Sequence, residues 1–202
     1  MFYEPRLGHG LPHDPFKACV APRPIGWIST VSRAGHVNLA PFSYFNAVLD
    51  FPPTVMFSAS GPHPDGGLKD TAQNAEETGE FVYNVATWDL REAMNLTSAA
   101  LGREVDEFEL AKLEKVPSRL VRPPRILASP IHLECRTIQV LALPTSRPEI
   151  QNRVVFGEVV GVHIDERVLV DGQVDLTLVR PIARCGYNDY AVVDSIFSIR
   201  RP

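Results

Sequence analysis

Prolines and glycines divide this chain into many short apolar segments. The 202 residues include 18 prolines and 13 glycines, and both residue types interrupt helices and central strands. The segments between them are rich in β-branched and aromatic residues, which pack well on a pleated sheet. This pattern predicts a mainly β barrel or sandwich with a few helices, rather than regular β-α-β units. A chain of this length is expected to form one domain over residues 1–202, with 1–15 as an N-terminal leader.

Several of these segments have the composition of strands. Residues 27–32 and 37–40 flank the turn-like stretch 33–36, so they are expected to form a hairpin. Pro41 should limit how far the pairing continues, because proline has no N–H to donate. Further strands are expected at 54–60, 81–86, 131–143, 153–164 and 176–180. The long segments 131–143 and 153–164 are expected to close a barrel.

A helix is expected over residues 71–78. Asp70 is placed to cap its start, and Gln73 follows three residues later, as in a capping box. Gly79 is placed to end it in the left-handed conformation that glycine tolerates.

A second helix is expected over residues 90–101, where Asp89 and Glu92 give a similar start signal. A short third helix is expected near 106–113. The segment 115–130 carries four prolines and little periodicity, which predicts a long loop over the mouth of the barrel.

Bulk properties argue against several classes of protein. The net charge is −4 with no basic stripe, so no nucleic-acid partner is expected. No apolar run reaches the ~18 residues of a membrane helix, and the N-terminus lacks the order of a signal peptide, which predicts a cytoplasmic protein. The three cysteines stand far apart, so neither a zinc site nor a disulfide framework is indicated. No hydrolase, metalloprotease or P-loop signature occurs, and no catalytic side chain or metal ligand is assigned.

Two neighbouring segments carry groups that suit an anion. Lys69, Asp70 and Thr71 open a helix, whose first turn presents unpaired N–H groups and a partial positive charge. The same residues also fit an ordinary capped helix with a solvated lysine. Just before them, the segment 58–60 ends a strand, and alternation places the hydroxyls of Ser58 and Ser60 on one side. The glycines that follow allow the backbone to approach a ligand closely.

Residues 38–46 combine amides, hydroxyls and aromatic rings. Asn38 and the run Ser43-Tyr44-Phe45-Asn46 could contact the polar edge of a ring system while an aromatic side chain packs on its face. A hairpin with buried aromatic residues is the alternative, and core burial is favoured for Phe45 itself. Arg23 lies between two prolines that restrict the backbone, which suits either a phosphate contact or a surface salt bridge.

In their order and spacing, these segments resemble the flavin reductase-like, FMN-binding split-barrel family over roughly residues 22–190. The resemblance rests on Ala21-Pro-Arg-Pro-Ile-Gly-Trp-Ile-Ser-Thr30, Asn38-Leu-Ala-Pro-Phe-Ser-Tyr-Phe-Asn46, Pro52-Pro-Thr-Val-Met-Phe-Ser58, Lys69-Asp-Thr71 with Asn74, Gly79-Glu-Phe-Val-Tyr-Asn84, and Pro181-Ile-Ala-Arg-Cys-Gly-Tyr-Asn-Asp-Tyr190. In the last motif, Tyr187 stands where the family usually has a second glycine. The resemblance implies an α+β chain that is mainly β with flanking helices: a six-stranded antiparallel split β-barrel of Greek-key type. It also implies a homodimer with FMN near the subunit interface.

The resemblance also implies roles for individual residues. Ser43, Tyr44, Phe45 and Asn46 would contact the isoalloxazine, partly through backbone groups. The ribityl chain and phosphate would meet residues 58–60, which are Ser58, Ala59 and Ser60, and the phosphate would also meet Lys69 and Thr71. The remaining candidate cofactor-binding residues are Arg23, Ser29, Thr30, Asn38 and Asp70.

The function implied is that of an FMN-dependent oxidoreductase. The flavin supplies the electron chemistry, so no catalytic side chain is required. NADH or NADPH would donate two electrons to a flavin, or through it to another acceptor such as a monooxygenase. The segment 115–130, with His132, is expected to shape the nicotinamide pocket. Two alternatives stay open: a flavin-binding electron carrier with no nicotinamide site, and a pyridoxamine-phosphate oxidase-like enzyme.

Overall fold

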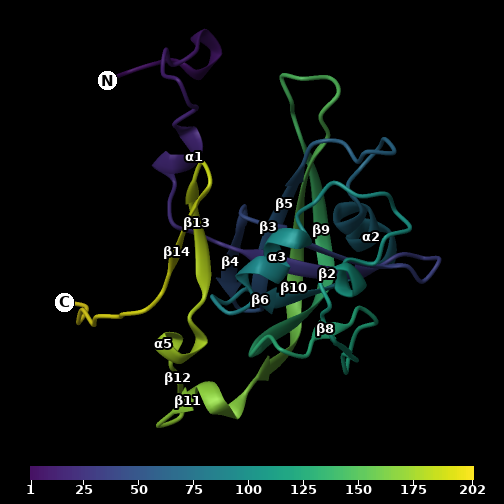
Figure 1. The fold of residues 1–202 in the computed structure, drawn as a ribbon, viewed down its shortest axis with the longest axis vertical. Coiled ribbons are helices and arrows are strands. Elements are labelled where there is room, and N and C mark those ends of the chain that lie inside the picture. The colour runs from purple at the N-terminus through teal and green to yellow at the C-terminus, as the bar shows by residue number, and fades with distance from the viewer.

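The computed structural model describes residues 1–202. Its main sheet has seven antiparallel strands (Figure 1). Their order across the sheet is β3-β2-β6-β9-β10-β5-β4. In that order they span Val37–Phe42, Gly26–Val31, Glu80–Val85, Ile131–Leu143, Asn152–Ile164, Pro53–Ser60 and Phe45–Asp50. The expected mainly β fold is confirmed, with one strand more in this sheet than the six that were expected. The composition did not predict the edge strand β4.

Aromatic side chains show how the sheet curls into a split barrel. Phe42 on β3, the first strand in the order, and Phe57 on β5, the last but one, have ring centroids only 5.2 Å apart. Phe57 meets Phe81 edge-to-face at 5.3 Å, and Phe45 stacks on Tyr83 at 4.5 Å. Because strands far apart in the order share one core, the two edges of the sheet must approach each other. Helix α2, Asp70–Thr78, packs beside this barrel (Figure 1).

At Gly157, β10 packs closely against Phe81. A Cβ added at Gly157 would lie 2.3 Å from Phe81 Cζ and 3.2 Å from Cys135 Cβ. We expect Gly157→Ala to lower the free energy of unfolding by about 1–3 kcal/mol, because a full core must shift to accept the methyl group. Urea unfolding measures this, with Gly102→Ala as the control, since a Cβ there meets nothing closer than 3.6 Å. Equal stabilities of the two variants would contradict the predicted overpacking.

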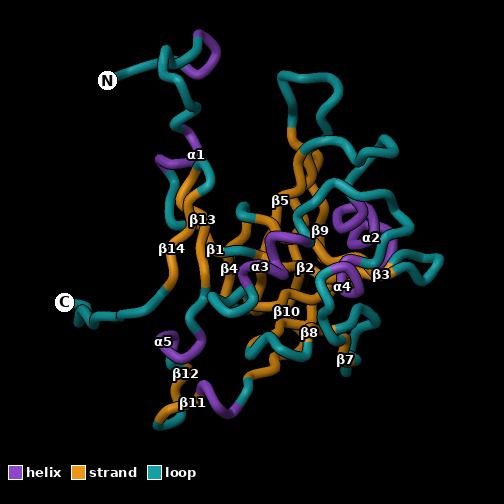
Figure 2. The backbone as a smooth tube through the Cα atoms, in the orientation of Figure 1, coloured by secondary structure: helices purple, strands orange, loops and turns teal.

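A second, three-stranded sheet stands beside the barrel (Figure 2). It has the order β1-β13-β14, with bounds Arg23–Pro24, Ile182–Gly186 and Asp189–Val192. The short helix α1, Phe16–Cys19, packs against β13, and a Cβ at Gly186 would lie 2.8 Å from Ala18 Cα. Both ends of the chain extend away from the barrel (Figure 1). The remaining small elements are η1 Pro5–Leu7, β7 Lys115–Val116, β8 Arg125–Ile126, η2 Glu166–Val168, β11 Leu169–Val170 and β12 Gln173–Val174.

The hairpin and the long strands follow the sequence-based predictions. β2 and β3 pair around the expected turn, and β9 and β10 lie within one residue of their predicted bounds. Pro41 does not end the pairing, which continues to Phe42 opposite Gly26. As expected, 115–130 is mostly loop, apart from the two-residue ladder of β7 and β8. None of the helices is long and apolar enough to cross a bilayer.

The helices require four corrections. Lys69, not Asp70, is the N-cap residue of α2, although Gly79 ends the helix at φ 74° as expected. Helix α3 covers only Arg91–Leu96 of the predicted 90–101, and no side-chain cap begins it. Helix α4, Glu107–Leu110, is shorter than predicted. Residues 176–180 are not a strand: Leu176–Val179 form helix α5, because the Asp175 carboxylate accepts the N–H of Thr177 at 2.8 Å.

Candidate functional site

The N-terminus of α2 offers several donors to an anion. No side chain caps the helix at Lys69, so the N–H groups of residues 70–72 lie in a first turn that provides them no carbonyl partner. They form the positive end of the helix dipole. Desolvation lowers the pKa of the Lys69 ammonium, which lines the adjoining cavity. This arrangement of a helix end and a lysine is suited to a phosphate group.

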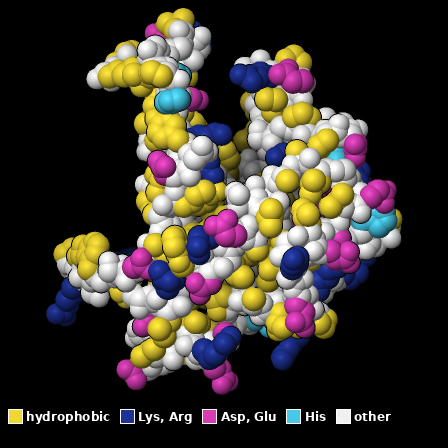
Figure 3. Space-filling model, viewed as in Figure 1, with side chains coloured by type: hydrophobic (Ala, Val, Ile, Leu, Met, Phe, Trp, Pro, Cys, Tyr) yellow, Lys and Arg dark blue, Asp and Glu magenta, His cyan; other side chains and the backbone are white.

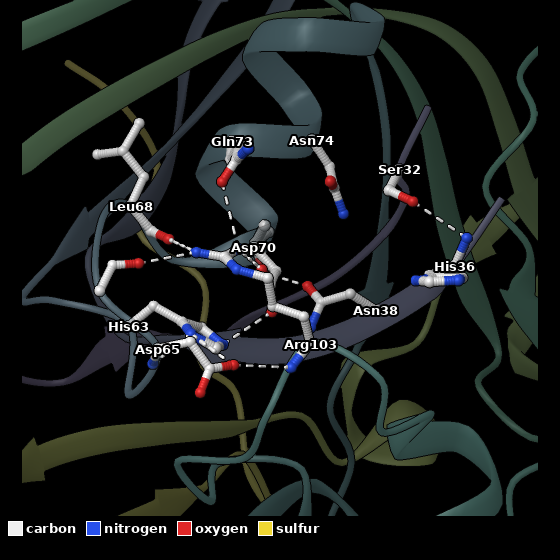
Figure 4. A network of polar contacts seen from close by, with 12 residues as sticks. Ser32, His36, Asn38, His63, Asp65, Leu68, Asp70, Gln73, Asn74 and Arg103 are labelled. Atoms are coloured by element: carbon white, nitrogen blue, oxygen red, sulfur yellow. Dashed lines mark hydrogen bonds and ion pairs between the residues drawn. The ribbon is translucent and has the colours of Figure 1, made fainter. Parts of the chain in front are cut away.

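Arg103 fixes the loop that leads into this helix (Figure 4). Its guanidinium donates to the main-chain oxygens of Gly66 at 2.9 Å and Leu68 at 3.2 Å. It also donates to Gln73 Oε1 at 3.2 Å and forms an ion pair with the Asp70 carboxylate. One side chain thus joins the glycine-containing loop to the first turn of α2.

His63 supports the same loop from the other side of Asp70 (Figure 4). Its Nδ1 accepts the Asp65 N–H at 3.0 Å, so its proton is placed on Nε2, which lies 3.1 Å from Asp70 Oδ2. The Asp70 carboxylate is therefore engaged by Arg103 and His63. Because its charge is compensated, it opposes an anion at the neighbouring N–H groups less than a free carboxylate would.

A groove leads from this helix end toward the second sheet. Its first part is a cavity of about 130 Å³, lined by Lys69, Thr71, Asn38 and the segment 97–101 among others. A larger cavity of about 550 Å³ lies between the barrel, α1 and the β13–β14 hairpin. Pro41 and Ser98 line both cavities, so they adjoin. Figure 3 shows the surface hollowed between this hairpin and the barrel. The shape suits an elongated ligand with one anionic end.

A buried polar network forms the floor of the smaller cavity. Asn38 is its centre: its Oδ1 accepts the Thr71 hydroxyl at 2.6 Å, and its Nδ2 donates to Glu107 Oε1 at 3.0 Å. Asn74 Nδ2 donates to Thr30 Oγ1 at 3.0 Å, and Thr30 lies 3.5 Å from Asn38. Burial raises the pKa of Glu107, although hydrogen bonds to its carboxylate oppose the change. Since the Thr71 hydroxyl donates inward, the main-chain N–H of Thr71 is its available donor toward the cavity.

The larger cavity contains two of the predicted residues, Ser43 and Arg23. Arg23 is buried and makes no salt bridge; its guanidinium donates to the carbonyls of Lys17 and Val20, while its Nε has no partner. It lies 5.7 Å from the Tyr44 ring centroid. It lines the larger cavity and not the one beside Lys69, so it is not placed at the expected phosphate end.

Several predicted residues lie outside the groove. Ser29 is fully buried and donates to the Pro124 oxygen at 2.6 Å, and Phe45 belongs to the core. Asn46 is exposed and accepts the Ala47 N–H at 3.0 Å. Ser60 donates to Asn152 Oδ1 at 2.7 Å. The Ser58 N–H donates to the Tyr44 oxygen at 2.8 Å, which ties residues 43–46 to the strand end that carries Ala59.

The loop 115–130 and His132 do not shape this groove. They form a separate cavity, which shares no lining residue with the two parts of the groove. That His132 shapes a nicotinamide pocket stays a prediction.

Sequence reasoning missed Arg103, His63 and the β13–β14 contribution to the groove. Arg184 on β13 lies over the Tyr190 ring at 4.5 Å and bonds to the Tyr187 oxygen, and all three residues line the larger cavity. Arg103 is 33 residues from its partner Asp70, so no local pattern indicates the contact. The late motif did include Arg184 and Tyr190, but nothing in the sequence placed it beside residue 43.

Comparisons with known proteins identify the family and the fold. A family model described as a flavin reductase like domain matches residues 19–177. An uncharacterised protein of Halalkalibacterium halodurans is 39% identical over 91% of this chain and 87% of its own. The crystal structure of nitrilotriacetate monooxygenase component B from Bacillus cereus superposes with a TM-score of 0.88 at 29% identity, covering 98% of each chain.

A Shewanella frigidimarina structure described as having a flavin reductase split barrel domain has a TM-score of 0.80 at 22% identity, over 93% of this chain and 90% of its own. That likeness shows the fold. The family model spans most of the chain, and the structural match extends over nearly all of it. The chain therefore belongs to the flavin reductase-like family of FMN-binding split-barrel proteins.

Proposed function

We propose that this protein is an FMN-dependent oxidoreductase that takes two electrons from NADH or NADPH and passes them to a flavin or another acceptor. The observation that carries the proposal is the pair of adjoining cavities, with a helix N-terminus and a lysine beside the smaller one. Lys69 and the first turn of α2 line the smaller cavity, and Ser43 and Arg184 line the larger one. Family membership supports flavin as the ligand.

The groove's own residues fit FMN at both ends. Lys69 and the N–H groups of residues 70–72 would hold the phosphate. The larger cavity would hold the ring system, with Ser43, Arg23 and the Tyr190 ring at its walls. The buried Arg23 Nε has no partner in the protein and is a donor available to the polar edge of that ring system.

When bound, the flavin supplies the hydride and electron chemistry. The protein's own residues bind and orient it. The network around Asn38 and the Arg103 contacts keep the anion site preformed, and the β13–β14 hairpin covers one side of the larger cavity. No side-chain acid or base is needed in this scheme.

The direct test is an absorption spectrum and an FMN fluorescence titration, followed by steady-state oxidation of NADH and NADPH with added FMN. A flavin spectrum and quenching on titration are expected, together with turnover of one nicotinamide. Binding without turnover would indicate an electron carrier instead. Pyridoxal phosphate formation from pyridoxamine phosphate would indicate an oxidase of the other split-barrel type. Absence of FMN binding would contradict the proposal.

We expect Arg103→Gln to weaken FMN binding by roughly tenfold. The variant loses charged hydrogen bonds that hold residues 66–68 against α2, so the phosphate site must be ordered when the ligand binds. Fluorescence titration measures the affinity. Arg33→Gln is the control, since Arg33 is exposed and lies near the other end of the helix, at Glu77. An unchanged affinity in Arg103→Gln would contradict a positioning role.

We further propose that the whole chain acts as one domain in a cytoplasmic homodimer, with a monooxygenase as one possible class of acceptor. The extended termini expose Phe2, Phe197 and Ile199, and Phe51 at the end of β4 is 96% exposed. Apolar side chains in extended arms are stabilised when a second subunit covers them. Light scattering of the purified protein should give twice the chain mass, and deletion of residues 195–202 should shift it toward the monomer. A monomeric intact chain would contradict this assembly.

A further inference from the structure

The separate cavity beside the loop 115–130 has a volume of about 350 Å³ and lies where β9 and β10 meet the loop before β9. Arg119, Arg125, His132, Val162 and His163 are among the residues that line it. Its volume is within the range of small-molecule sites. It shares no lining residue with the flavin groove, so a ligand here would not occupy the flavin site.

The cavity is positively charged and has no free protein anion. Neither Arg119 nor Arg125 forms an ion pair. Glu134 is 0% exposed, and its carboxylate already accepts the N–H groups of Arg119 at 2.8 Å and Leu120 at 2.6 Å, with His163 Nε2 at 2.5 Å. The carboxylate at the rim, Asp165, is paired with Arg167. The two guanidinium groups are therefore available to an outside anion.

Arg125 is held in place by its own contacts. One of its terminal nitrogens donates to the Pro117 oxygen at 3.1 Å, while its Nε is buried and has no partner. A buried donor without a partner is destabilising, and a bound acceptor would satisfy it.

His132 provides a fixed acceptor in the same cavity. It is 4% exposed, and its Nε2 lies 2.8 Å from the Ile126 oxygen. A carbonyl oxygen only accepts, so the proton is on Nε2 and the buried, unpartnered Nδ1 presents a lone pair. Burial lowers the pKa of His132 to about 4, so the ring is neutral near pH 7.

Apolar side chains complete the lining. Leu127, Val162 and Ile164 line the cavity, and all three are exposed although hydrophobic. A ligand that matches the arginines, the His132 nitrogen and the apolar side chains therefore has an anionic group, a hydrogen-bond donor and an apolar part. Inorganic phosphate matches the arginines but leaves the apolar wall uncovered.

We propose that this cavity binds a small organic acid whose carboxylate meets Arg119 and Arg125, whose hydroxyl or amino group donates to His132 Nδ1, and whose apolar part covers Val162 and Ile164. The site is independent of the flavin groove. It goes beyond the proposed oxidoreductase function and does not depend on it.

Methyl NMR of the full-length, FMN-saturated protein tests the proposal. The probes are 2-, 3- and 4-hydroxybenzoate, benzoate, 4-hydroxybenzyl alcohol and inorganic phosphate. We expect at least one hydroxybenzoate to shift the methyl signals of Leu127, Val162 and Ile164. Benzoate should bind roughly tenfold more weakly than that isomer, and the neutral alcohol and phosphate more weakly still. The ¹⁵N signal of His132 Nδ1 should move on binding the hydroxybenzoate but not benzoate.

Substitutions locate the charge contacts. Arg125→Gln is expected to weaken hydroxybenzoate binding by tenfold or more, and Arg119→Gln serves as a second variant should the first fold poorly. Arg122→Gln is the matched control, because Arg122 lies on the same loop but pairs with Glu80 outside the cavity. The proposal is overturned if no hydroxybenzoate moves these methyl signals, if the shifts occur only around the flavin groove, if phosphate binds as tightly, or if Arg125→Gln and Arg122→Gln bind alike.

Discussion

Lys69→Gln is expected to lower the affinity for FMN by about tenfold to a hundredfold. A charged hydrogen bond to a phosphate contributes about 1.5–3 kcal/mol, and each 1.4 kcal/mol changes a dissociation constant tenfold. Lys69 is the ammonium that lines the smaller cavity beside the first turn of α2. The remaining N–H groups keep part of the site, so binding is weakened and not abolished. Fluorescence titration with FMN measures the effect.

Riboflavin separates a phosphate contact from a general disturbance of the site. It has the same ring system and ribityl chain but no phosphate, so its affinity should be nearly the same in the original chain and in Lys69→Gln. Lys112→Gln is the matched control: Lys112 is an exposed lysine that does not line the groove. An equal loss of riboflavin and FMN affinity would show that Lys69 does not bind the phosphate.

The sequence predicts long, regular elements of this fold well. β9 and β10 are 13-residue strands rich in β-branched residues, and their predicted bounds are correct to within one residue. The edge strand β4 is different. Five of its six residues are exposed, so no alternation of apolar and polar residues marks it. Its pairing with β5 across a tight turn defines it instead.

Residues 176–180 show why composition alone misleads for short segments. The sequence Leu-Thr-Leu-Val has strand composition, but the Asp175 carboxylate accepts the Thr177 N–H at 2.8 Å and its hydroxyl at 2.6 Å, and these contacts begin a helical turn there. In four residues, one capping side chain outweighs the propensity differences of the others.

Within the site, local signals identify the helix end but not its supports. Lys69 and Thr71 line the smaller cavity at the start of α2, and their role in binding an anion stays a prediction. Ser29 and Thr30 are neighbours on β2 with side chains on opposite faces, yet both are fully buried. Because successive side chains of a strand point to opposite faces, the sequence pattern predicts that only one of two neighbouring residues is buried. Here the loop at Pro124 covers Ser29, and Asn74 on α2 contacts Thr30.

His132 should contribute a loss of about 2–3 kcal/mol of stability between pH 7.5 and 4.5. Burial lowers the pKa of His132 from 6.5 to about 4 in the folded chain. Between these values the unfolded chain binds a proton that the folded chain does not, so acid favours unfolding over this range. A full shift of this size corresponds to about 3 kcal/mol, and most of it is reached at pH 4.5. Urea unfolding at several pH values measures it.

The variant His132→Gln should remove most of this slope, whatever its stability at pH 7.5. His36→Gln should keep the slope, because the His36 side chain is 52% exposed. Burial alone would raise the pKa of Glu134, but hydrogen bonds from Arg119, His163 and Leu120 hold it below its ordinary value, so its contribution is lost at lower pH. Burial raises the pKa of Glu107, so acid favours the folded chain at that group, and the difference in slope between the original chain and His132→Gln isolates the ring. A slope that persists in His132→Gln would mean that the buried ring is not the group responsible. That result would also contradict the neutral His132 ring that the proposed organic-acid site uses as its acceptor. The measurement therefore tests the pH dependence and one premise of that site.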